Sequence, residues 1–470
     1  MSHDDGISNK SDNRPFTDVL EGYSSRRTFM TGSLALAAGT FFGGSVAHAA
    51  RGGQPGPNQN YGQLKHLGEN FGINFTPVPV AEGTGSMPAI SEDYQFQVVI
   101  PWGTPLESGV QAYEGDPGTR PSAADQERMV GIGHDGMHFF PFGGSNENGV
   151  MAINLEFGRN SHVLGKPFPE TDEDIRLSQA AHGVALVELK KQADGTWSHV
   201  LDSDYNRRIT PNTPVEFGGP VKGSELIYPE AGAMGTVNNC SRGYTPWGTY
   251  LTCEENFNGY FGATGDWTPT EQQERYGFSS GGFGYGWENH TTDRRFDLSS
   301  SAHPNEDNRF GWVVEIDPMS PGKTPVKRTA LGRFKHEGVA IAVGRGGRVV
   351  CYMGDDQRFD YIYKFVSESN WKSMRARGMS PLDHGTLYVA RFNDDGSGDW
   401  LPLTTDNPVL TGWSEAEILT YARLAADRVG ATPMDRPEWT HVAPNGDVYC
   451  TLTNNSRRTE ADAANPLAPN

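Results

Sequence analysis

One local pattern occurs four times along the chain and constrains what the chain can fold into. Each copy has a polar residue, an apolar run, a turn, and a second apolar run that ends in acidic or amide residues. The leading polar residues lie 105, 97 and 101 residues apart and are Asp135, Cys240, Glu337 and Glu438. The repetition predicts four equivalent pairs of strands joined by turns.

The clearest copy occupies residues 238–256. Cys240 lies among small polar residues, a turn follows at Pro246-Trp247-Gly248, and the second apolar run ends at Glu254 and Glu255. In the third copy, the second run ends at Asp355. Each copy therefore offers possible metal ligands at both ends of its pair of strands.

Composition favours an all-β protein. The chain has 58 Gly and 31 Pro and is 11% aromatic, which is typical of many short strands joined by turns. Helices are expected only over residues 414–428, with Ser414 as N-cap, and near residues 370–377. Strands are expected at 94–101, in the four copies, and at 185–189, 197–201, 208–209, 309–318 and 361–365, with a long Gly-rich insertion at 257–307.

The spacing of the copies favours a β-propeller with long insertions. Blades run about 40 to 50 residues, so a step of about 100 residues is two blades, or one blade with a large insertion. Blades surround a central channel, and residues at the start of the inner strands point toward it. We therefore expect the four leading residues to converge, although they are far apart in sequence.

The types of these residues indicate metal binding. Carboxylates and amides select hard cations such as calcium, whereas a thiolate favours softer or transition metals such as iron or zinc. Taken singly, each acidic residue is also consistent with a solvated loop or turn, and Cys240 with a disulfide. Four copies in register favour ligands, because turn chemistry does not explain a ligand type ahead of every first strand.

The other three cysteines have a simpler interpretation. Cys253, Cys351 and Cys450 lie inside apolar runs, so we expect them to be small buried hydrophobic residues. The net charge of −19 argues against a nucleic-acid partner, because phosphates require a basic surface.

The N-terminus carries an export signal. Residues 24–30 form a twin-arginine pattern around Arg26-Arg27, followed by an uncharged stretch and an Ala47-His48-Ala49 cleavage site. The uncharged stretch is too short to span a bilayer. We expect a signal peptide over 1–49 that the twin-arginine translocase recognises, a periplasmic or extracellular mature chain, and no stable membrane insertion.

At these residues the chain resembles the PhoX family of bacterial alkaline phosphatases. The resemblance extends over nearly the whole mature chain. It rests on the twin-arginine leader, Asp135-Gly136-Met137-His138, and residues 239–256, 309–318, 333–337, 355–365 and 436–438. It implies an all-β, six-bladed β-propeller that holds Fe³⁺ and Ca²⁺ in its channel and hydrolyses small phosphomonoesters.

The resemblance also implies roles for particular residues. Cys240 is expected to ligate iron, and Glu254, Glu255 and Glu337 are expected to bind metal, with Asp135, Asp355 and Glu438 as weaker matches. Clustered cations of this kind bind phosphate oxygens and hold a nucleophile. Basic side chains are expected to complete the phosphate clamp, with Lys335 best placed and Arg242 and Arg358 next, although each is also consistent with a surface salt bridge.

The expected organisation is the signal peptide, an N-terminal extension over 50–92, and the propeller domain over 93–470. Asn470 ends a polar loop without a closing strand, where members of the family continue. We therefore expect the C-terminal part of the propeller to be missing from this chain. A monomer is expected.

Two alternatives remain at this point. One is a calcium-dependent lactonase or phosphotriesterase-like propeller, which uses a carboxylate and amide cage without a cysteine. The other is a binding propeller without catalytic activity. Iron content distinguishes the first alternative, because such a cage is expected to hold only calcium.

Overall fold

The structure is a computed structural model of the full chain. It describes residues 76, 78, 79, 82, 83, 85, 87–227 and 232–465. The predicted signal peptide, and most of the predicted extension over 50–92, lie outside the described residues. The chain divides into two compact units, residues 1–98 and residues 99–470. The strands and α-helices given below all belong to the second unit.

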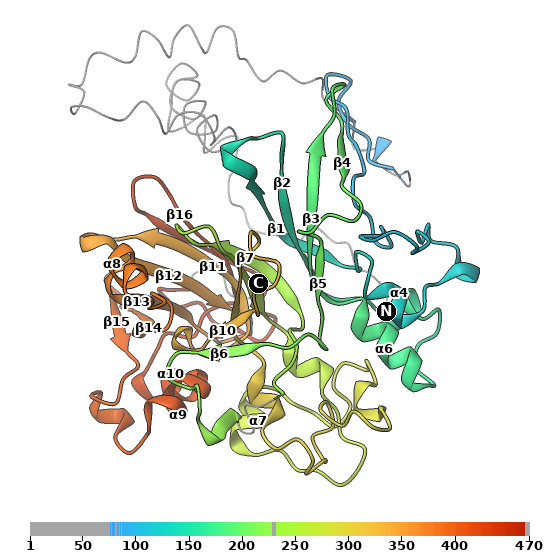
Figure 1. Cartoon of the computed structure of the whole chain (residues 1–470). Helices are drawn as coiled ribbons and strands as arrows, with labels where there is room; N and C mark the ends of the chain where they lie inside the picture. Colours follow the sequence, from blue (N-terminus) through green and yellow to red (C-terminus); the bar gives the residue numbers. More distant parts are fainter. Residues whose placement is uncertain are drawn as a thin grey trace, which may run out of the picture. The chain divides into compact units, whose positions relative to one another are not determined.

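The first sheet contains the first copy of the repeated pattern (Figure 1). Its strands are antiparallel neighbours in the order β1-β2-β3-β4, and β5 also pairs with β3. They are β1 (His134–Pro141), β2 (Asn148–Leu155), β3 (Gly183–Lys191), β4 (Trp197–His199) and β5 (Arg207–Ile209).

The second sheet contains the second copy, which forms β7 and β8. Its order is β6-β10-β9-β8-β7, with β6 and β10 parallel and the other pairs antiparallel. The strands are β6 (Glu216–Gly218), β7 (Asn239–Tyr244), β8 (Tyr250–Glu254), β9 (Val313–Ile316) and β10 (Val326–Arg328).

The third and fourth copies open two further antiparallel sheets. The third sheet has the order β11-β12-β13-β14-β15, and the fourth pairs β16 with β17. The strands are β11 (His336–Val343), β12 (Arg348–Asp355), β13 (Ile362–Asn370), β14 (Gly385–Phe392), β15 (Gly398–Pro402), β16 (Pro437–Val442) and β17 (Val448–Leu452). All four predicted pairs of strands are therefore confirmed.

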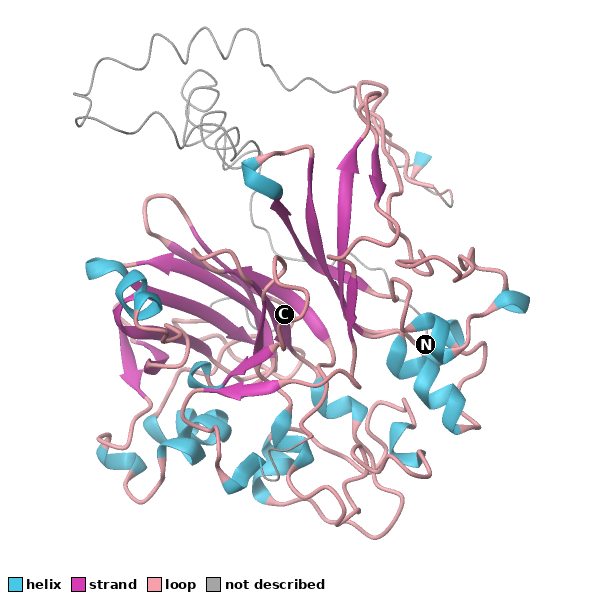
Figure 2. Cartoon of the chain, viewed as in Figure 1, coloured by secondary structure: helices cyan, strands magenta, loops and turns pink. Residues whose placement is uncertain are grey.

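The helices are short and lie outside the sheets (Figure 2). They are α4 (Ala123–Gln126), α5 (Asn160–Val163), α6 (Asp172–Ala180), α7 (Glu271–Arg275), α8 (Trp371–Ala376), α9 (Glu415–Thr420) and α10 (Ala422–Val429). The chain is thus predominantly β, as expected. In the described part, we find no helix that has both the length and the apolar character needed to cross a membrane.

Two predicted helices are confirmed, and one strand is not. Ser414 caps α9 by accepting a hydrogen bond from the Glu417 N–H, but the expected single helix breaks at Tyr421, where φ is −113° and ψ is 44°. Asn370 caps α8 in the same way. The prediction of a strand at 94–101 is wrong, because the structure forms no strand over these residues.

Helix α6 was missed by the sequence analysis. Its signal is a capping box, in which Thr171 and Asp174 satisfy one another's backbone N–H groups. Helix α7, inside the insertion, begins with a similar box formed by Thr270 and Gln273. Both helices are too short to produce a clear hydrophobic period.

The main core lies between the second and third sheets and helices α9 and α10. It includes Leu251, Cys253, Cys351, Val389 and Ile418, all fully or almost fully buried. Cys253 and Cys351 are therefore the small buried hydrophobic residues that the sequence predicted, whereas Cys450 is only partly buried. The four cysteines are free, so Cys240 forms no disulfide.

A buried ion pair links two strands of the second sheet. Lys327 on β10 and Glu254 on β8 are both completely buried, and the Lys327 Nζ lies 2.8 Å from Glu254 Oε1. The other carboxylate oxygen accepts backbone hydrogen bonds from Gly311 (2.9 Å) and Trp312 (3.0 Å). Such a pair is costly to break, because one charge is then left buried without compensation.

We therefore expect Lys327→Met to lower the free energy of unfolding by about 3 to 5 kcal/mol, measured by urea denaturation of the full chain. The matched control is Arg391→Ala, which breaks an exposed pair with Asp399 and should have a much smaller effect on stability. Equal losses in the two variants would contradict a special role for the buried pair.

Candidate metal centre

The leading residue of each copy lies in an irregularity of its sheet. The regular pairing is interrupted between residues 134 and 137 on β1, 239 and 242 on β7, 336 and 338 on β11, and 437 and 440 on β16. These intervals contain Asp135, Cys240, Glu337 and Glu438. Bulges redirect side chains out of the regular alternation, which frees these four from their own sheets.

The four strands that carry these bulges are neighbours. Strand β7 lies beside β1 on one side and β11 on the other, and β16 lies beside β11 (Figure 1). Glycine allows the close approach on both sides of β7. A Cβ on Gly136 would come within 2.9 Å of the Cys240 carbonyl oxygen, and one on Gly243 within 2.4 Å of the Val339 carbonyl oxygen.

A buried asparagine holds the Cys240 bulge in place. The Asn154 Nδ2 group, on β2, donates hydrogen bonds to the carbonyl oxygens of Cys240 (2.5 Å) and Ser241 (2.9 Å). Its Oδ1 accepts from the hydroxyl groups of Tyr250 and Thr252, both at 2.9 Å. The first and second sheets are thus joined directly behind the cysteine.

Two groups of possible metal ligands share Cys240. One group is Asp135, Glu156 and Cys240, and the other is Cys240, Glu255 and Glu337; in each, the ligand atoms lie within 4.8 Å of one another. The Cys240 Sγ is 3.3 Å from Glu337 Oε1 and 3.9 Å from Asp135 Oδ2. We refer to these five residues as the cysteine–carboxylate cluster.

The cluster concentrates acidic groups in a buried space. Burial, and then the charges of Asp135 and Glu337, raise the pKa of Glu156 to about 8. Burial, followed by the charge of Asp356, raises the pKa of Glu337 to about 7. Burial, followed by the charge of Glu337, raises the pKa of Glu255 and of the Cys240 thiol well above their usual ranges.

The donor set fits bound cations. Within the described residues, none of the four carboxylates of the cluster forms an ion pair with a lysine or arginine. Glu255 and Glu337 are buried and Asp135 and Glu156 are half-buried, and carboxylates in such surroundings without a basic partner favour protonation or metal coordination. Oxygen donors suit hard cations and the shared sulfur suits a transition metal, so the residues present fit a mixed centre.

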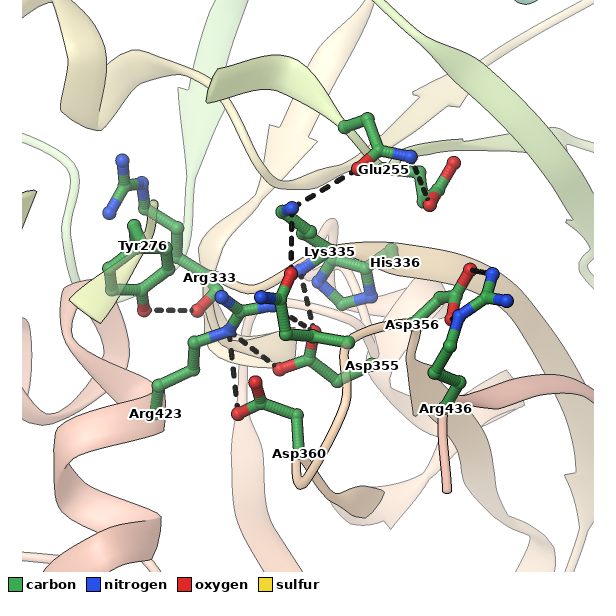
Figure 3. Close-up of polar contacts among 12 residues, drawn as sticks. Glu255, Tyr276, Arg333, Lys335, His336, Asp355, Asp356, Asp360, Arg423 and Arg436 are labelled. Atoms are coloured by element: carbon green, nitrogen blue, oxygen red, sulfur yellow. Dashed lines mark hydrogen bonds and ion pairs between the residues drawn. The ribbon is translucent and has the colours of Figure 1, made fainter. Parts of the chain in front are cut away.

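A lysine lies at the edge of the cluster (Figure 3). Lys335, directly before β11, is buried, and its Nζ donates hydrogen bonds to Asn256 Oδ1 (3.1 Å) and Gln357 Oε1 (2.8 Å). Asn256 in turn donates to the Glu255 carboxylate. Burial, and then the charge of Arg423, lower the pKa of Lys335 to about 8.

Two acidic residues near the lysine are occupied by arginines. Asp355, at the end of β12, is completely buried and receives two hydrogen bonds from Arg423, one of them 2.8 Å long. Asp356 receives two from Arg436, at 2.9 and 2.7 Å (Figure 3). Arg436 also lies 3.4 Å from Glu438, whose pKa burial and Asp356 raise.

The structure separates the residues that the sequence analysis grouped. It brings together Asp135, Cys240, Glu255 and Glu337. Glu254 and Asp355 were also expected to bind metal, but each is paired with a buried basic side chain. Lys327 contacts one oxygen of Glu254 and backbone N–H groups contact the other, whereas Arg423 contacts both oxygens of Asp355. Glu438 lies near Asp356 and Arg436 and outside the cluster.

The contacts of Arg242 and Arg358 differ from those expected of residues in a phosphate clamp. The Arg242 Nε donates to the Met137 carbonyl oxygen at 2.8 Å and so joins β7 to β1. No hydrogen bond or ion pair connects Arg358 to the cluster within the described part of the chain, and its Nε is buried without a hydrogen-bond partner there.

Glu156 is the cluster residue that the sequence analysis missed. It directly follows β2, which is the place that Glu255 takes after β8. This equivalence between the first and second copies was the available signal. Asp356, which raises the pKa of Glu337, was missed as well.

Comparisons with known proteins identify the family of the chain. A model of the family described as "Alkaline phosphatase PhoX" matches residues 73–470. This chain belongs to the PhoX family. The solved structure of Pseudomonas fluorescens PhoX in complex with vanadate, a transition state analogue, is 44% identical, with a TM-score of 0.74.

The alignment with that PhoX structure covers 81% of this chain and 68% of the Pseudomonas chain. No curated protein matches. The resemblance noted from the sequence is thus confirmed, and family and neighbour together support a phosphatase function.

The raised pKa values predict how the metal-free protein responds to pH. The folded state of Glu156 holds a proton up to about pH 8, whereas the unfolded state releases it near pH 4.5. Stability contributed by this proton is complete below pH 4.5 and is lost as pH rises toward 8. The free energy of unfolding of the unmodified chain should therefore fall by up to about 1.4 kcal/mol per pH unit over this range. Glu156→Gln should remove this fall.

The measurement is urea denaturation of the chelator-treated chain at pH 5 to 9. The surface variant Glu107→Gln controls for loss of a carboxylate. Parallel pH profiles for the Glu156→Gln variant and the unmodified chain would contradict the proton-holding role of Glu156. Added metal should flatten the profile of the unmodified chain, because bound cations replace the protons.

Proposed function

We propose that this PhoX chain is an exported, metal-dependent alkaline phosphatase that hydrolyses phosphate monoesters. The sharing of Cys240 between two groups of carboxylates carries the proposal. The lactonase-like alternative requires a cage without a cysteine, so the position of Cys240 favours the phosphatase. The vanadate bound to the Pseudomonas relative, a transition state analogue, is consistent with phosphoryl transfer.

The proposed fold is a six-bladed β-propeller over residues 93–470, preceded by the extension over 50–92. Support comes from four neighbouring strands, each of which lies at an edge of its sheet, namely β1, β7, β11 and β16. Inner strands of blades meet at a central channel, where ligands from distant parts of a chain converge. In the proposed fold, the cysteine–carboxylate cluster would lie in this channel.

The proposed cofactors are Ca²⁺ and Fe³⁺. Asp135, Glu156, Cys240, Glu255 and Glu337 would hold them, with the thiolate favouring iron and the carboxylates calcium. Bound cations would supply neutralisation of the phosphate oxygens and activation of an oxygen nucleophile.

Lys335 is the proposed phosphate-binding residue of the chain itself. Asn256 and Gln357 hold its ammonium group beside the cluster by hydrogen bonds, so it is positioned before substrate arrives. The Lys335 backbone N–H donates to Asp355, which Arg423 fixes in turn. The ammonium can donate to a phosphate oxygen as negative charge grows on it. Arg242 and Arg358 are proposed only as secondary contributors.

The proposed partners are small phosphomonoesters and, during export, the twin-arginine translocase. The leader over 1–49 supports this route, with the mature chain in the periplasm or outside the cell. A monomer without a nucleic-acid partner is proposed.

Replacing the shared ligand should remove both metal and activity. We expect Cys240→Ala to lower bound iron by at least tenfold and to abolish release of p-nitrophenol from p-nitrophenyl phosphate, because both groups lose their common sulfur. Iron and calcium per chain are measured by elemental analysis alongside the rate.

The control is Cys351→Ala, which removes a buried strand cysteine outside the cluster and should retain metal and activity. Full iron content and full activity in Cys240→Ala would overturn the proposed centre.

Removing the lysine charge should affect phosphate binding without affecting the metals. We expect Lys335→Met to lower kcat/KM for p-nitrophenyl phosphate by roughly 100-fold, as for loss of one preorganised donor. Lys335→Arg should recover part of the loss, because it retains a cation. Metal content should stay constant in both variants; unchanged kinetics in Lys335→Met would remove this residue from the mechanism.

A further inference from the structure

A cavity of about 450 Å³ opens beside the cysteine–carboxylate cluster. Glu156 of the cluster lies in its wall, and so does Asn256, which accepts a hydrogen bond from Lys335. The lining also includes the aromatic side chains of Phe157, Phe283 and Tyr285. The cavity therefore joins the proposed phosphate position to an apolar surface.

The insertion over 257–307 supplies most of the aromatic wall and is firmly attached. The Phe283 N–H donates to the Gly259 carbonyl oxygen at 2.8 Å. The Phe283 ring lies on the Gly259 backbone so closely that a Cβ there would come within 2.1 Å of a ring carbon. The position of the ring thus depends on the absence of a side chain at residue 259.

A second aromatic contact connects this wall to the cluster. Tyr285 stacks on Tyr260, with ring centroids 4.3 Å apart and planes 12° from parallel. The Tyr260 hydroxyl donates to the Glu156 carbonyl oxygen at 3.1 Å. The aromatic wall and the metal-binding strand end are therefore held at a constant separation.

A buried amide fixes the loop that carries both rings. The Asn160 Nδ2 group donates to the carbonyl oxygens of Tyr285 (3.1 Å), Gly284 (3.3 Å) and Pro167 (3.4 Å). Asn160 is buried. The loop is consequently preorganised, which lowers the entropic cost of binding a ligand against it.

The aromatic side chains on the wall are exposed to solvent. Phe283 is 59% exposed and Phe157 is 43% exposed. A fixed loop that presents apolar rings beside a charged centre gains free energy when a flat apolar group covers them. The lining also contains polar side chains, among them Glu156, Arg159 and Asn256. The cavity thus suits a ligand with one aromatic and one anionic end.

We propose that this cavity is a leaving-group subsite that selects phosphomonoesters whose leaving group carries a flat aromatic ring. The inference rests on the proposed phosphatase function. The phosphate lies toward Glu156, Asn256 and Lys335, and the ring of the leaving group lies against Phe283 and Phe157. Phe283 is therefore a specificity-determining residue of the reaction.

The test compares two substrates of the metal-loaded full chain, p-nitrophenyl phosphate and glycerol 2-phosphate, which has no ring. We expect Phe283→Ala to lower kcat/KM for p-nitrophenyl phosphate by about tenfold, in line with the loss of an aromatic contact. The value for glycerol 2-phosphate should change by less than about twofold. An equal loss on both substrates, or no loss on either, overturns the subsite.

Phe392→Ala is the matched control, because Phe392 is also an exposed phenylalanine, at the end of β14, and it does not line the cavity. It should leave both substrates unchanged. Phe283→Leu keeps an apolar contact with Gly259 while removing the ring, so it tests the same point if the alanine variant does not fold.

A binding measurement separates this inference from the proposed function. Phenylphosphonate and methylphosphonate carry an anionic group and cannot be hydrolysed. By calorimetry, Phe283→Ala should weaken phenylphosphonate binding about tenfold and leave methylphosphonate binding unchanged. Failure of the unmodified, metal-loaded chain to hydrolyse either p-nitrophenyl phosphate or glycerol 2-phosphate would contradict the proposed function, whereas equal binding of phenylphosphonate by Phe283→Ala and the unmodified chain would contradict only the subsite.

Discussion

The concentration of buried negative charge around Cys240 is the constraint on which the rest of the structure depends. Asp135, Glu156, Glu255 and Glu337 surround one sulfur, and burial raises the pKa of each of these carboxyls. Such a group is unfavourable by itself, because ionised carboxylates repel one another and lose hydration. Only the rigidity of the surrounding sheets and the presence of cations or protons make it stable.

The surrounding ion pairs decide which carboxylates remain available for metal. Lys327 occupies Glu254, Arg423 occupies Asp355, and Arg436 occupies Asp356. Each of these acids directly follows or ends a second strand, as Glu156 and Glu255 of the cluster do. The difference is therefore made by the partner, which comes from a distant part of the chain. Acids with a basic partner stabilise the sheets, and acids without one form the centre.

This division explains which parts of the fold and of the centre could be predicted from the sequence. The four pairs of strands, the buried Cys253 and Cys351, and the convergence of Asp135, Cys240 and Glu337 followed from local patterns and their repetition. The pairing of Glu254 with Lys327 could not be predicted, because 73 residues separate the partners and no periodicity links them. Glu156 could have been predicted from the repeat, because it follows β2 as Glu255 follows β8. It was missed because the first copy ends in one acidic residue, whereas the second ends in two.

The bulges connect this local chemistry to the fold. In a regular strand, alternate side chains face opposite sides, so a polar residue next to an apolar run would either enter the core or face away from the neighbouring sheets. An extra residue in β1, β7 and β11 turns one side chain toward the common centre without changing the register of the apolar residues that follow. Gly136 and Gly243 then allow these strands to approach closely enough for the redirected ligands to meet. The centre therefore depends on backbone geometry as much as on ligand identity: restoring regular pairing at Cys240 would keep the cysteine in the sequence but move its sulfur away from both groups of carboxylates.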